Sequence, residues 1–221
     1  MSKSTNAQVF DRTAERAAAV ARFHTASVLL VVSAIIWTLS AMPTRAQTQA
    51  GDVASIKGEA QAEAAEKRRP LVQGTVVFVD EVITTGASSR LTLNLGRNTT
   101  IKLGEGVRMR IDRHMVNAGG AFDLQSGAVL FDRGAGAPKG DTALRSPYGL
   151  LAVRGTKFFA GPSNGVFGVF VVRGRVDVTG AGKTVRLTAG LGTNIASPGD
   201  APTKPAAWKA PRVKAALLSV Q

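Results

Sequence analysis

The sequence predicts an all-β domain, and two observations support this fold class. The chain has 221 residues, of which 24 are glycine, while aromatic residues make up only 5%. Low aromatic and high glycine content with many Val, Thr and Leu is typical of a turn-rich β-domain rather than a helical bundle. The second observation is that apolar residues alternate with polar ones over three consecutive segments between residues 91 and 112. Such alternation indicates strands with one buried and one solvated face.

The first 46 residues resemble a targeting segment. An uncharged stretch of 16 residues, 26–41, follows a mildly basic region, and Thr44-Arg45-Ala46 places small residues around a cleavage point. This arrangement predicts a secretory signal peptide that is cleaved after Ala46. An uncleaved anchor is the alternative, because the basic region is long, although about 20 apolar residues are needed to span a bilayer comfortably. Both interpretations place the bulk of the chain outside the cytoplasm.

The next elements are strands separated by polar turns. Residues 53–62 predict a short strand with a turn or bulge at Lys57-Gly58. Residues 60–69 have helical propensity but no apolar stripe, and we interpret them as a charged loop that ends at Pro70. Residues 76–82 form an apolar run that is typical of a sheet.

The clearest alternation follows and predicts a β-meander, with turns at residues 96–98 and 104–106. The residues expected to face its core are Leu91, Leu93, Leu95, Ile101, Leu103, Val107, Met109 and Ile111. A hairpin is predicted next, with residues 122–124 and 128–131 joined by a turn at 125–127. Residues 134–141 are expected to form a flexible loop.

A glycine interrupts the strand that follows the Ser146-Pro147-Tyr148-Gly149 turn. If Val153 faces the core, strict alternation would also turn Lys157 inwards, and burying an unpaired lysine is costly. One extra residue at Gly155 restores the phase, with Thr156 inside and Lys157 outside. The sequence therefore predicts a β-bulge at Gly155. The simpler interpretation is a bent core strand, and the functional one is that Arg154 and Lys157 face a partner.

The last third of the domain predicts long strands. Asn164-Gly165 is a hairpin turn signal, and the continuous apolar run 166–172 indicates a strand buried on both faces. Alternation then resumes, with Arg173, Arg175 and Asp177 facing outwards. A last short strand is expected around residues 194–196. The proline-rich tail 197–221 is interpreted as an extended linker, whose apolar end, 213–220, either docks or forms two helical turns.

Charge gives the candidate binding residues. The net charge is +13, which favours anionic partners, but the cations are spread singly along strands, without the aromatic stacking pattern of nucleic-acid binders. The candidate partner-binding residues are Arg154, Lys157, Arg173 and Arg175, and the wider set of outward-facing arginines adds Arg108, Arg110 and Arg186. The alternative is a solvated sheet face that keeps strands from pairing with other chains.

Residues for catalysis or metal binding are not found. The chain has no cysteine and two histidines, and His114 stands alone between Arg113 and Met115. Asp80 and Glu81 are adjacent, so on a strand they would point to opposite faces. Phosphate-binding loops, nucleophile elbows and zinc motifs are absent from the sequence. We therefore expect no enzymatic activity, no cofactor and no metal.

Several motifs, in order, resemble the FecR domain family. The main match is Ser-Pro-Tyr-Gly at 146–149 followed by Ala-Val-Arg-Gly-Thr-Lys-Phe at 152–158. Residues 51–58, 71–74, 82–86, 122–129, 172–178 and 187–190 match further parts of the family pattern, while Gly96-Arg97-Asn98 departs from its common Asp-Gly-Ser turn. The resemblance covers residues 51–196, and its structural positions are Pro147, Gly149, Gly155, Thr156, Gly174 and Gly190.

The resemblance implies a β-sandwich, jelly-roll-like domain of antiparallel sheets in the periplasm. The best-known members relay a signal from an outer-membrane transporter to a cytoplasmic sigma factor. Only about 25 residues precede the apolar stretch here, too few for the folded anti-sigma segment of those members, and we expect a stand-alone module that binds another envelope protein. The alternatives are a membrane-anchored signalling subunit and a binder of anionic glycans. The oligomeric state and the partner's identity are left open.

Overall fold

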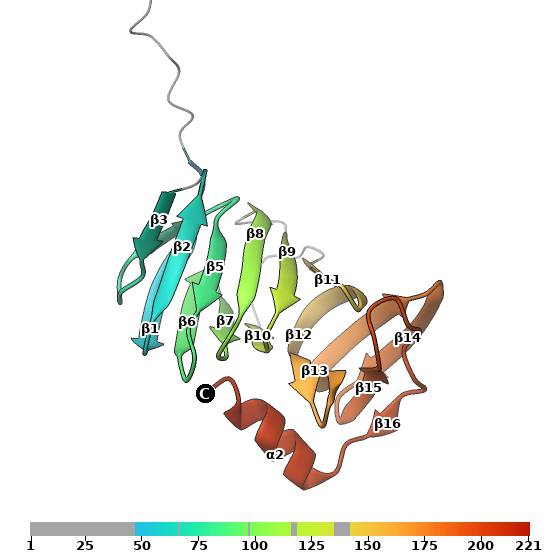
Figure 1. Cartoon of the computed structure of the whole chain (residues 1–221). Coiled ribbons are helices and arrows are strands. Elements are labelled where there is room, and N and C mark those ends of the chain that lie inside the picture. Colours follow the sequence, from blue (N-terminus) through green and yellow to red (C-terminus); the bar gives the residue numbers. More distant parts are fainter. Residues whose placement is uncertain (1–46, 66, 97, 116–118, 135–141) are drawn as a thin grey trace, which may run out of the picture. The chain divides into compact units, whose positions relative to one another are not determined.

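A computed structural model describes residues 47–65, 67–96, 98–115, 119–134 and 142–221 (Figure 1). The chain divides into two units, residues 1–46 and 47–221, and all described residues belong to the second. The apolar stretch 26–41, the cleavage point after Ala46 and the loop 135–141 therefore lie outside the described residues. Within the described ranges, no helix has the length and hydropathy needed to cross a membrane.

Strands dominate the described unit, as the alternation predicted, and one helix follows them near the C-terminus. The strands are β1 (Gln49–Lys57), β2 (Ala60–Ala64), β3 (Lys67–Pro70), β4 (Val76–Phe78), β5 (Val82–Thr85), β6 (Arg90–Leu95), β7 (Thr99–Leu103), β8 (Arg108–Met115), β9 (Gly119–Ser126), β10 (Val129–Arg133), β11 (Thr142–Ser146), β12 (Gly149–Ser163), β13 (Val166–Gly180), β14 (Lys183–Thr188), β15 (Leu191–Ile195) and β16 (Ala206–Ala207). The helix is α2 (Ala210–Leu218).

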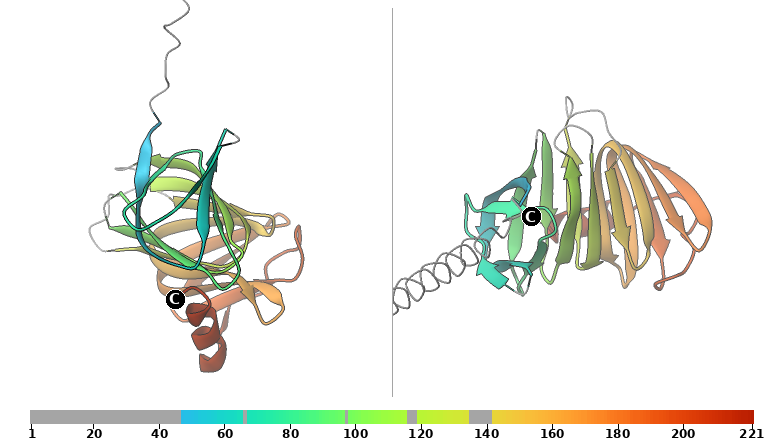
Figure 2. Two further views of the ribbon diagram at one scale, coloured as in Figure 1. Left: turned by 60° about the vertical axis from the view of Figure 1, so that its left-hand side comes forward. Right: turned by 90° about the horizontal axis from the view of Figure 1, so that it is seen from above.

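These strands form one continuous sheet that folds over into two layers. The hydrogen-bonded order runs β3-β2-β5-β8-β9-β11 and then through β12 into β10-β7-β6-β1-β4. The long strand β12 joins the layers, and β13 pairs with it along most of its length. Pairs are antiparallel except for β9 and β11, which run parallel. Figure 2 shows the strands of the two layers curling around a common interior, a β-sandwich as the family resemblance implied.

The predicted core positions are buried between the two layers. Leu93, Leu95 and Leu103 are fully buried, and Met109 and Ile111 join the same apolar cluster from the other layer. The polar residues between them are more exposed, as in Thr92 and Lys102. Burial of this many Leu, Ile, Val and Phe side chains is the main stabilising contribution, at about 1.5–3 kcal/mol for each fully buried one.

Two predicted connections are wrong. The meander is not formed, because β6 pairs with β7 but β8 lies between β5 and β9 in the other layer. The predicted hairpin of residues 122–131 is likewise absent, since β9 pairs with β8 and β11 while β10 pairs with β7 and β12. Both crossings lie at one end of the sandwich, where the Ser126 hydroxyl donates to the Gly106 carbonyl at 3.0 Å. Alternation reports which face of a strand is buried and says nothing about its neighbour.

The segment interpreted as a charged loop is instead the hairpin of β2 and β3. Ala62 pairs with Arg69, and Ala60 and Ala62 are buried, so small residues with high helix propensity supply the inward face of β2. The predicted run 76–82 is also interrupted: Asp80 has φ +69°, and the turn around it separates β4 from β5. The buried carboxylate of Glu81 accepts three hydrogen bonds from the Arg69 guanidinium near this turn, at 2.8, 2.9 and 3.2 Å. Arg69 also donates to the Val76 carbonyl, and so links β3 to β4.

The tail is not an extended linker. Thr203 bonds to Asn194 of β15, β16 extends the same edge, and α2 begins at Ala210 with Pro211 in its first turn. Both alternatives for residues 213–220 are observed, because α2 is helical to Leu218 and its Ala216, with Val220 after it, is buried in a second apolar cluster. Leu130, Phe159 and Phe170 complete this cluster from the outer side of the sheet, which explains why β13 is buried on both faces from Phe167 to Val171.

Candidate partner-binding site

The centre of the predicted site is a β-bulge between β12 and β13. Arg154 lies opposite Arg175 and Lys157 lies opposite Arg173, so β12 has one residue more than β13 across this interval. Gly155 has φ +60°, and Thr156 is fully buried, as the predicted change of phase requires. A second shift in register follows between Lys157 and Phe158, which places Val172 as the extra residue on β13. The two shifts give a local bend in both strands.

Both long strands exchange their outer neighbours at this bend. Before it, residues 149–153 of β12 pair with β11, and after it residues 157–160 pair with β10. In the same way, residues 167–170 of β13 pair with β15 and residues 175–180 pair with β14. The bulge is therefore the corner where the sheet passes from one layer of the sandwich to the other. This structural role accounts for a bulge at Gly155 whatever the chain binds.

A second glycine allows the strands to approach at the corner. A Cβ atom added to Gly174 would lie 2.4 Å from Thr156 Cγ2 and 2.8 Å from the Gly155 carbonyl oxygen, so no larger residue fits without a shift. Thr156 Oγ1 is buried and finds no hydrogen-bond partner among the described residues.

The other motif positions support the same strands. Pro147 occupies the turn between β11 and β12, and Gly149 begins β12 with its α-carbon against the Thr179 carbonyl. The Gly190 amide donates to the Val171 carbonyl at 2.9 Å, which holds the β14–β15 connection beside the second register shift.

Basic side chains gather on the outer side of this bend. We call Lys157, Arg173 and Arg175, together with the carboxylate of Asp132 on β10, the basic corner. Lys157 Nζ lies 3.0 Å from Asp132 Oδ2, and an Arg173 nitrogen lies 2.9 Å from Asp132 Oδ1. Arg173 also donates to the Arg133 carbonyl at 3.1 Å. Two cations thus share one carboxylate while Arg175 lies beside them without an ion pair to it, and the corner has net positive charge.

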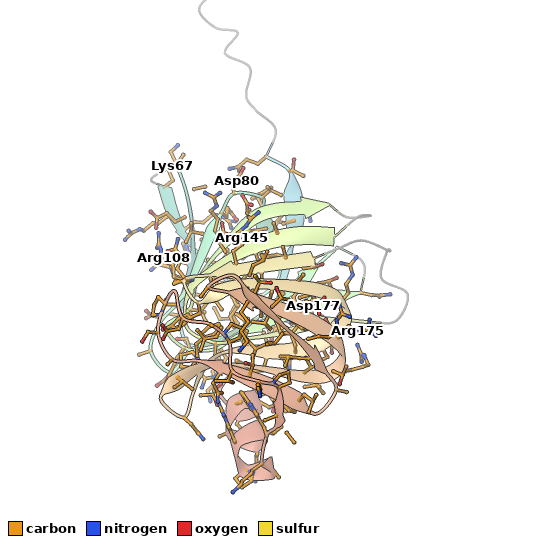
Figure 3. The ribbon with its side chains drawn as sticks, turned by 90° about the vertical axis from the view of Figure 1, so that its right-hand side faces the viewer. Lys67, Asp80, Arg108, Arg145, Arg175 and Asp177 are labelled. Carbon is orange, nitrogen blue, oxygen red and sulfur yellow. The ribbon has the colours of Figure 1, made fainter. Side chains whose placement is uncertain are left out.

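Each predicted site residue can now be placed. Lys157 and Arg173 have side chains that are 34% and 54% exposed, and Arg175 is exposed without a hydrogen bond or ion pair among the described residues. Arg154 lies opposite Arg175 in the strand register, but its side chain is outside the described set. In Figure 3, Arg175 projects on the opposite side of the view from Arg108 and Arg145.

The remaining outward arginines belong to structural ion pairs. Arg110 on β8 pairs with Asp112, which Arg145 of β11 also contacts at 2.9 Å. On β13 and β14, Asp177 accepts two hydrogen bonds from Arg186, at 2.8 and 3.1 Å. The hydrogen bond from Arg110 holds the pKa of Asp112 below its usual value, and the bond from Arg186 does the same for Asp177. For these positions, the simple explanation of a paired, solvated sheet face is sufficient.

Sequence reasoning missed Asp132 of the corner and the exposed Val172 beside it. Asp132 is the carboxylate shared by two of the predicted cations, and its place next to buried Phe131 would have shown only that it faces outwards. Val172 is 36% exposed because the second register shift turns it out of the apolar run. The positions of Asp132 and Val172 depend on which strands pair, which alternation does not determine.

The cations at the site offer chemistry for binding. Among the described residues, no three acidic, histidine or cysteine side chains come together as metal ligands. The carboxylate of Glu81, the one buried carboxylate in the described part of the chain, is engaged by Arg69 and by the Phe78 amide, which donates to it at 2.9 Å. Asp80 is exposed while Glu81 is buried, in keeping with the prediction that the two do not act together.

Comparisons with known proteins agree with the motif. Residues 81–177 match the family model described as FecR protein, a range that includes the bulge and the whole basic corner. Two crystal structures of a candidate anti-sigma factor from Parabacteroides distasonis, at 1.65 and 2.50 Å resolution, share the fold with a TM-score of 0.51 and 16% identity. They cover 62% of this chain, which in turn spans 64% and 63% of theirs. No curated protein matches the chain in sequence.

Proposed function

Because residues 81–177 match the FecR family, we propose that the chain is a non-enzymatic signalling module of the cell envelope that binds another envelope protein. The observation that carries this proposal is the basic corner, where Lys157 and Arg173 share the carboxylate of Asp132 and Arg175 is exposed beside them. The surface lies at the bend that the family motif creates. The solved structures that share the fold are described as a candidate anti-sigma factor, in keeping with a regulatory role.

The charge of the corner defines the partner's surface. A surface with three cations and one carboxylate is complementary to an acidic patch, and such complementarity increases the rate of association and sets orientation. Val172 adds an apolar contact beside the charges. The complex should weaken as ionic strength rises, because exposed charges are screened over about 8–10 Å at physiological salt.

Photo-crosslinking in the cells that produce the protein tests the proposal. A photoreactive residue at Val172 reports on the corner without removing a charge, and the same residue at Val72, which is 61% exposed on a turn outside the corner, is the matched control. We expect one envelope protein to be captured from position 172 and not from 72, and Arg175→Glu to abolish its capture. The charge control is Lys183→Glu, at the exposed first residue of β14.

Two results would count against the proposal. Equal capture from positions 172 and 72 would mean that the corner is not the contact surface. Capture that survives Arg175→Glu unchanged would mean that the partner does not recognise the cations. In either case, the corner would have only the structural role that its bulge and strand exchange already give it.

A further inference from the structure

A second basic surface lies in a cavity on the outer side of β1, β6 and β7. The cavity has a volume of about 370 Å³, and Ser55, Lys57, Arg90, Thr92 and Lys102 line it. Ile56 of β1 and, after α2, Val220 and Gln221 complete its wall. Figure 1 shows the C-terminal end of α2 close to the lower ends of β6 and β7. The cavity is separate from the basic corner, which β10, β12 and β13 form.

The strand register places the polar side chains of this cavity together. Lys57 lies opposite Arg90, Ser55 lies opposite Thr92, and Thr92 lies opposite Lys102 on the next strand. Side chains directly opposite each other on neighbouring strands have Cβ atoms about 4.5–5.5 Å apart, and like charges in such a pair are destabilising. The pairing of Lys57 with Arg90 therefore has a cost in the free energy of folding that a bound anion would remove.

Protein groups do not balance this charge. Arg90 has a weak ion pair with Glu105 at 3.8 Å, while Lys57 and Lys102 form no ion pair with any described residue. The end of α2 contributes a partial negative charge of about half an elementary charge, which is small against three cations. Protection of a sheet edge does not explain Arg90 and Lys102, since β6 and β7 each pair with a strand on both sides, whereas β4 pairs with β1 only at residues 49–52 and leaves Lys57 beyond that pairing.

Arg90 also has an unused hydrogen-bond donor. One of its terminal nitrogens donates to the Ser89 carbonyl at 2.8 Å, but its Nε is shielded from solvent and has no acceptor among the described residues. A buried donor without a partner is destabilising, because its desolvation is not compensated.

We propose that this cavity binds a phosphomonoester. A phosphomonoester carries between about one and a half and two negative charges at neutral pH and three acceptor oxygens. Lys57, Arg90 and Lys102 supply the matching positive charge, and the hydroxyls of Ser55 and Thr92 supply further donors. A carboxylate brings one charge and two oxygens, and would leave more of this cluster unsatisfied. The cavity exceeds the size of a phosphate group, so part of the molecule that carries the phosphate fits inside it as well.

The test is a titration of the full chain, followed by backbone amide NMR. The soluble probe is sn-glycerol 3-phosphate, with sodium chloride at matched ionic strength as the control for screening. Vesicles of phosphatidylcholine with and without phosphatidic acid present the same phosphomonoester on a lipid.

We expect the amide signals of Thr92 and Lys102 to shift with one of these probes. Lys57→Gln and Lys102→Gln should each weaken binding by about tenfold or more, since each removes a charge-assisted hydrogen bond. Lys183→Gln should leave binding unchanged.

The outcomes distinguish a soluble ligand from a lipid headgroup, and some of them would contradict the proposed site. Binding of glycerol 3-phosphate points to a soluble ligand, and binding only to phosphatidic acid vesicles points to a lipid headgroup. The proposal fails if neither probe binds, if chloride has the same effect, or if Lys57→Gln and Lys102→Gln bind as tightly as the unaltered chain. Lys57 is exposed and Lys102 half-buried, so these variants should fold, and their melting temperatures check this. Because the two surfaces are separate, failure here leaves the corner's crosslinking result unaffected.

Discussion

At the scale of single residues, Gly155 shows how much the sequence could predict. The conflict between alternation and a buried Lys157 located the bulge, and the φ of +60° at Gly155 with Thr156 fully buried confirms it. The same reasoning could not find Asp132, which joins the corner only because β10 pairs with β12. A residue's own strand pattern predicts its orientation, whereas its neighbours depend on topology.

The Gly155 conformation gives the first prediction. Gly155→Val places a β-branched residue at positive φ and should lower the free energy of unfolding by about 1–3 kcal/mol. Space is not the cause, because an added Cβ at Gly155 meets no atom within 4 Å. Arg154→Ala should leave stability nearly unchanged and weaken only partner capture. Urea unfolding measures the stability of the two variants. Equal destabilisation would mean that Arg154 has a structural role and is not a binding residue.

At the scale of elements, strands were predictable and their partners were not. The alternation of β6, β7 and β8 correctly gave their buried faces, yet β8 belongs to the other layer. The hairpin of β2 and β3 was missed because alanines that favour helices supply its buried side. The end of the tail docks on the sheet as a helix, which combines the two predicted alternatives. The packing of Trp208 explains why it docks. Its ring stacks on Phe170 with centroids 5.2 Å apart, and the Arg212 guanidinium lies 3.6 Å above it.

Trp208 therefore provides a test of α2. Trp208→Ala removes the contacts with Phe170, Phe159 and Arg212, and the ring is half-buried, so we expect a loss of about 2–4 kcal/mol. Hydrogen exchange should show faster exchange in α2 at residues 213–218, with β6 and β7 little changed. The control is Leu218→Ala, because Leu218 is 53% exposed and its removal should cost little. If α2 keeps its protection in Trp208→Ala, the cluster around Phe159 and Ala216 suffices to hold the helix.

At the scale of the whole molecule, the sequence predicted the fold class and a cellular location but not which strands form each layer. The all-β class and the family motif were confirmed, while the partition into layers depends on β12 and β13 changing neighbours at the bulge. The location in the cell envelope stays a prediction. Protein purified from the envelope should begin at Gln47, and N-terminal sequencing or intact mass measurement checks this. An intact N-terminus in the inner membrane would favour the anchored alternative.

Acid stability is also a property of the whole molecule, because the chain has a net charge of +13 and few carboxylates. Hydrogen bonds from arginine lower the pKa of Asp112 and Asp177 in the folded state. A group with a lowered pKa stabilises the fold above its unfolded value, about pH 4, and this contribution disappears as pH falls through the folded value. Protonation also leaves the arginines of both faces without counter-charges, so repulsion between them adds to the loss.

The last prediction is that stability falls below about pH 4 and that Asp112→Asn reduces this fall. The variant has already lost the ionised partner of Arg110 and Arg145, so it should be less stable at pH 6 and closer to the unaltered chain at pH 3. Because the side chain of Asp112 is 27% exposed, the difference should be modest and smaller at high salt. Urea unfolding at the two pH values measures this difference in stability.

Glu59→Gln is the control, since Glu59 is exposed and forms no ion pair with a described residue. An equal effect of both substitutions would mean that net charge, and not the arginine pairs, sets the acid limit.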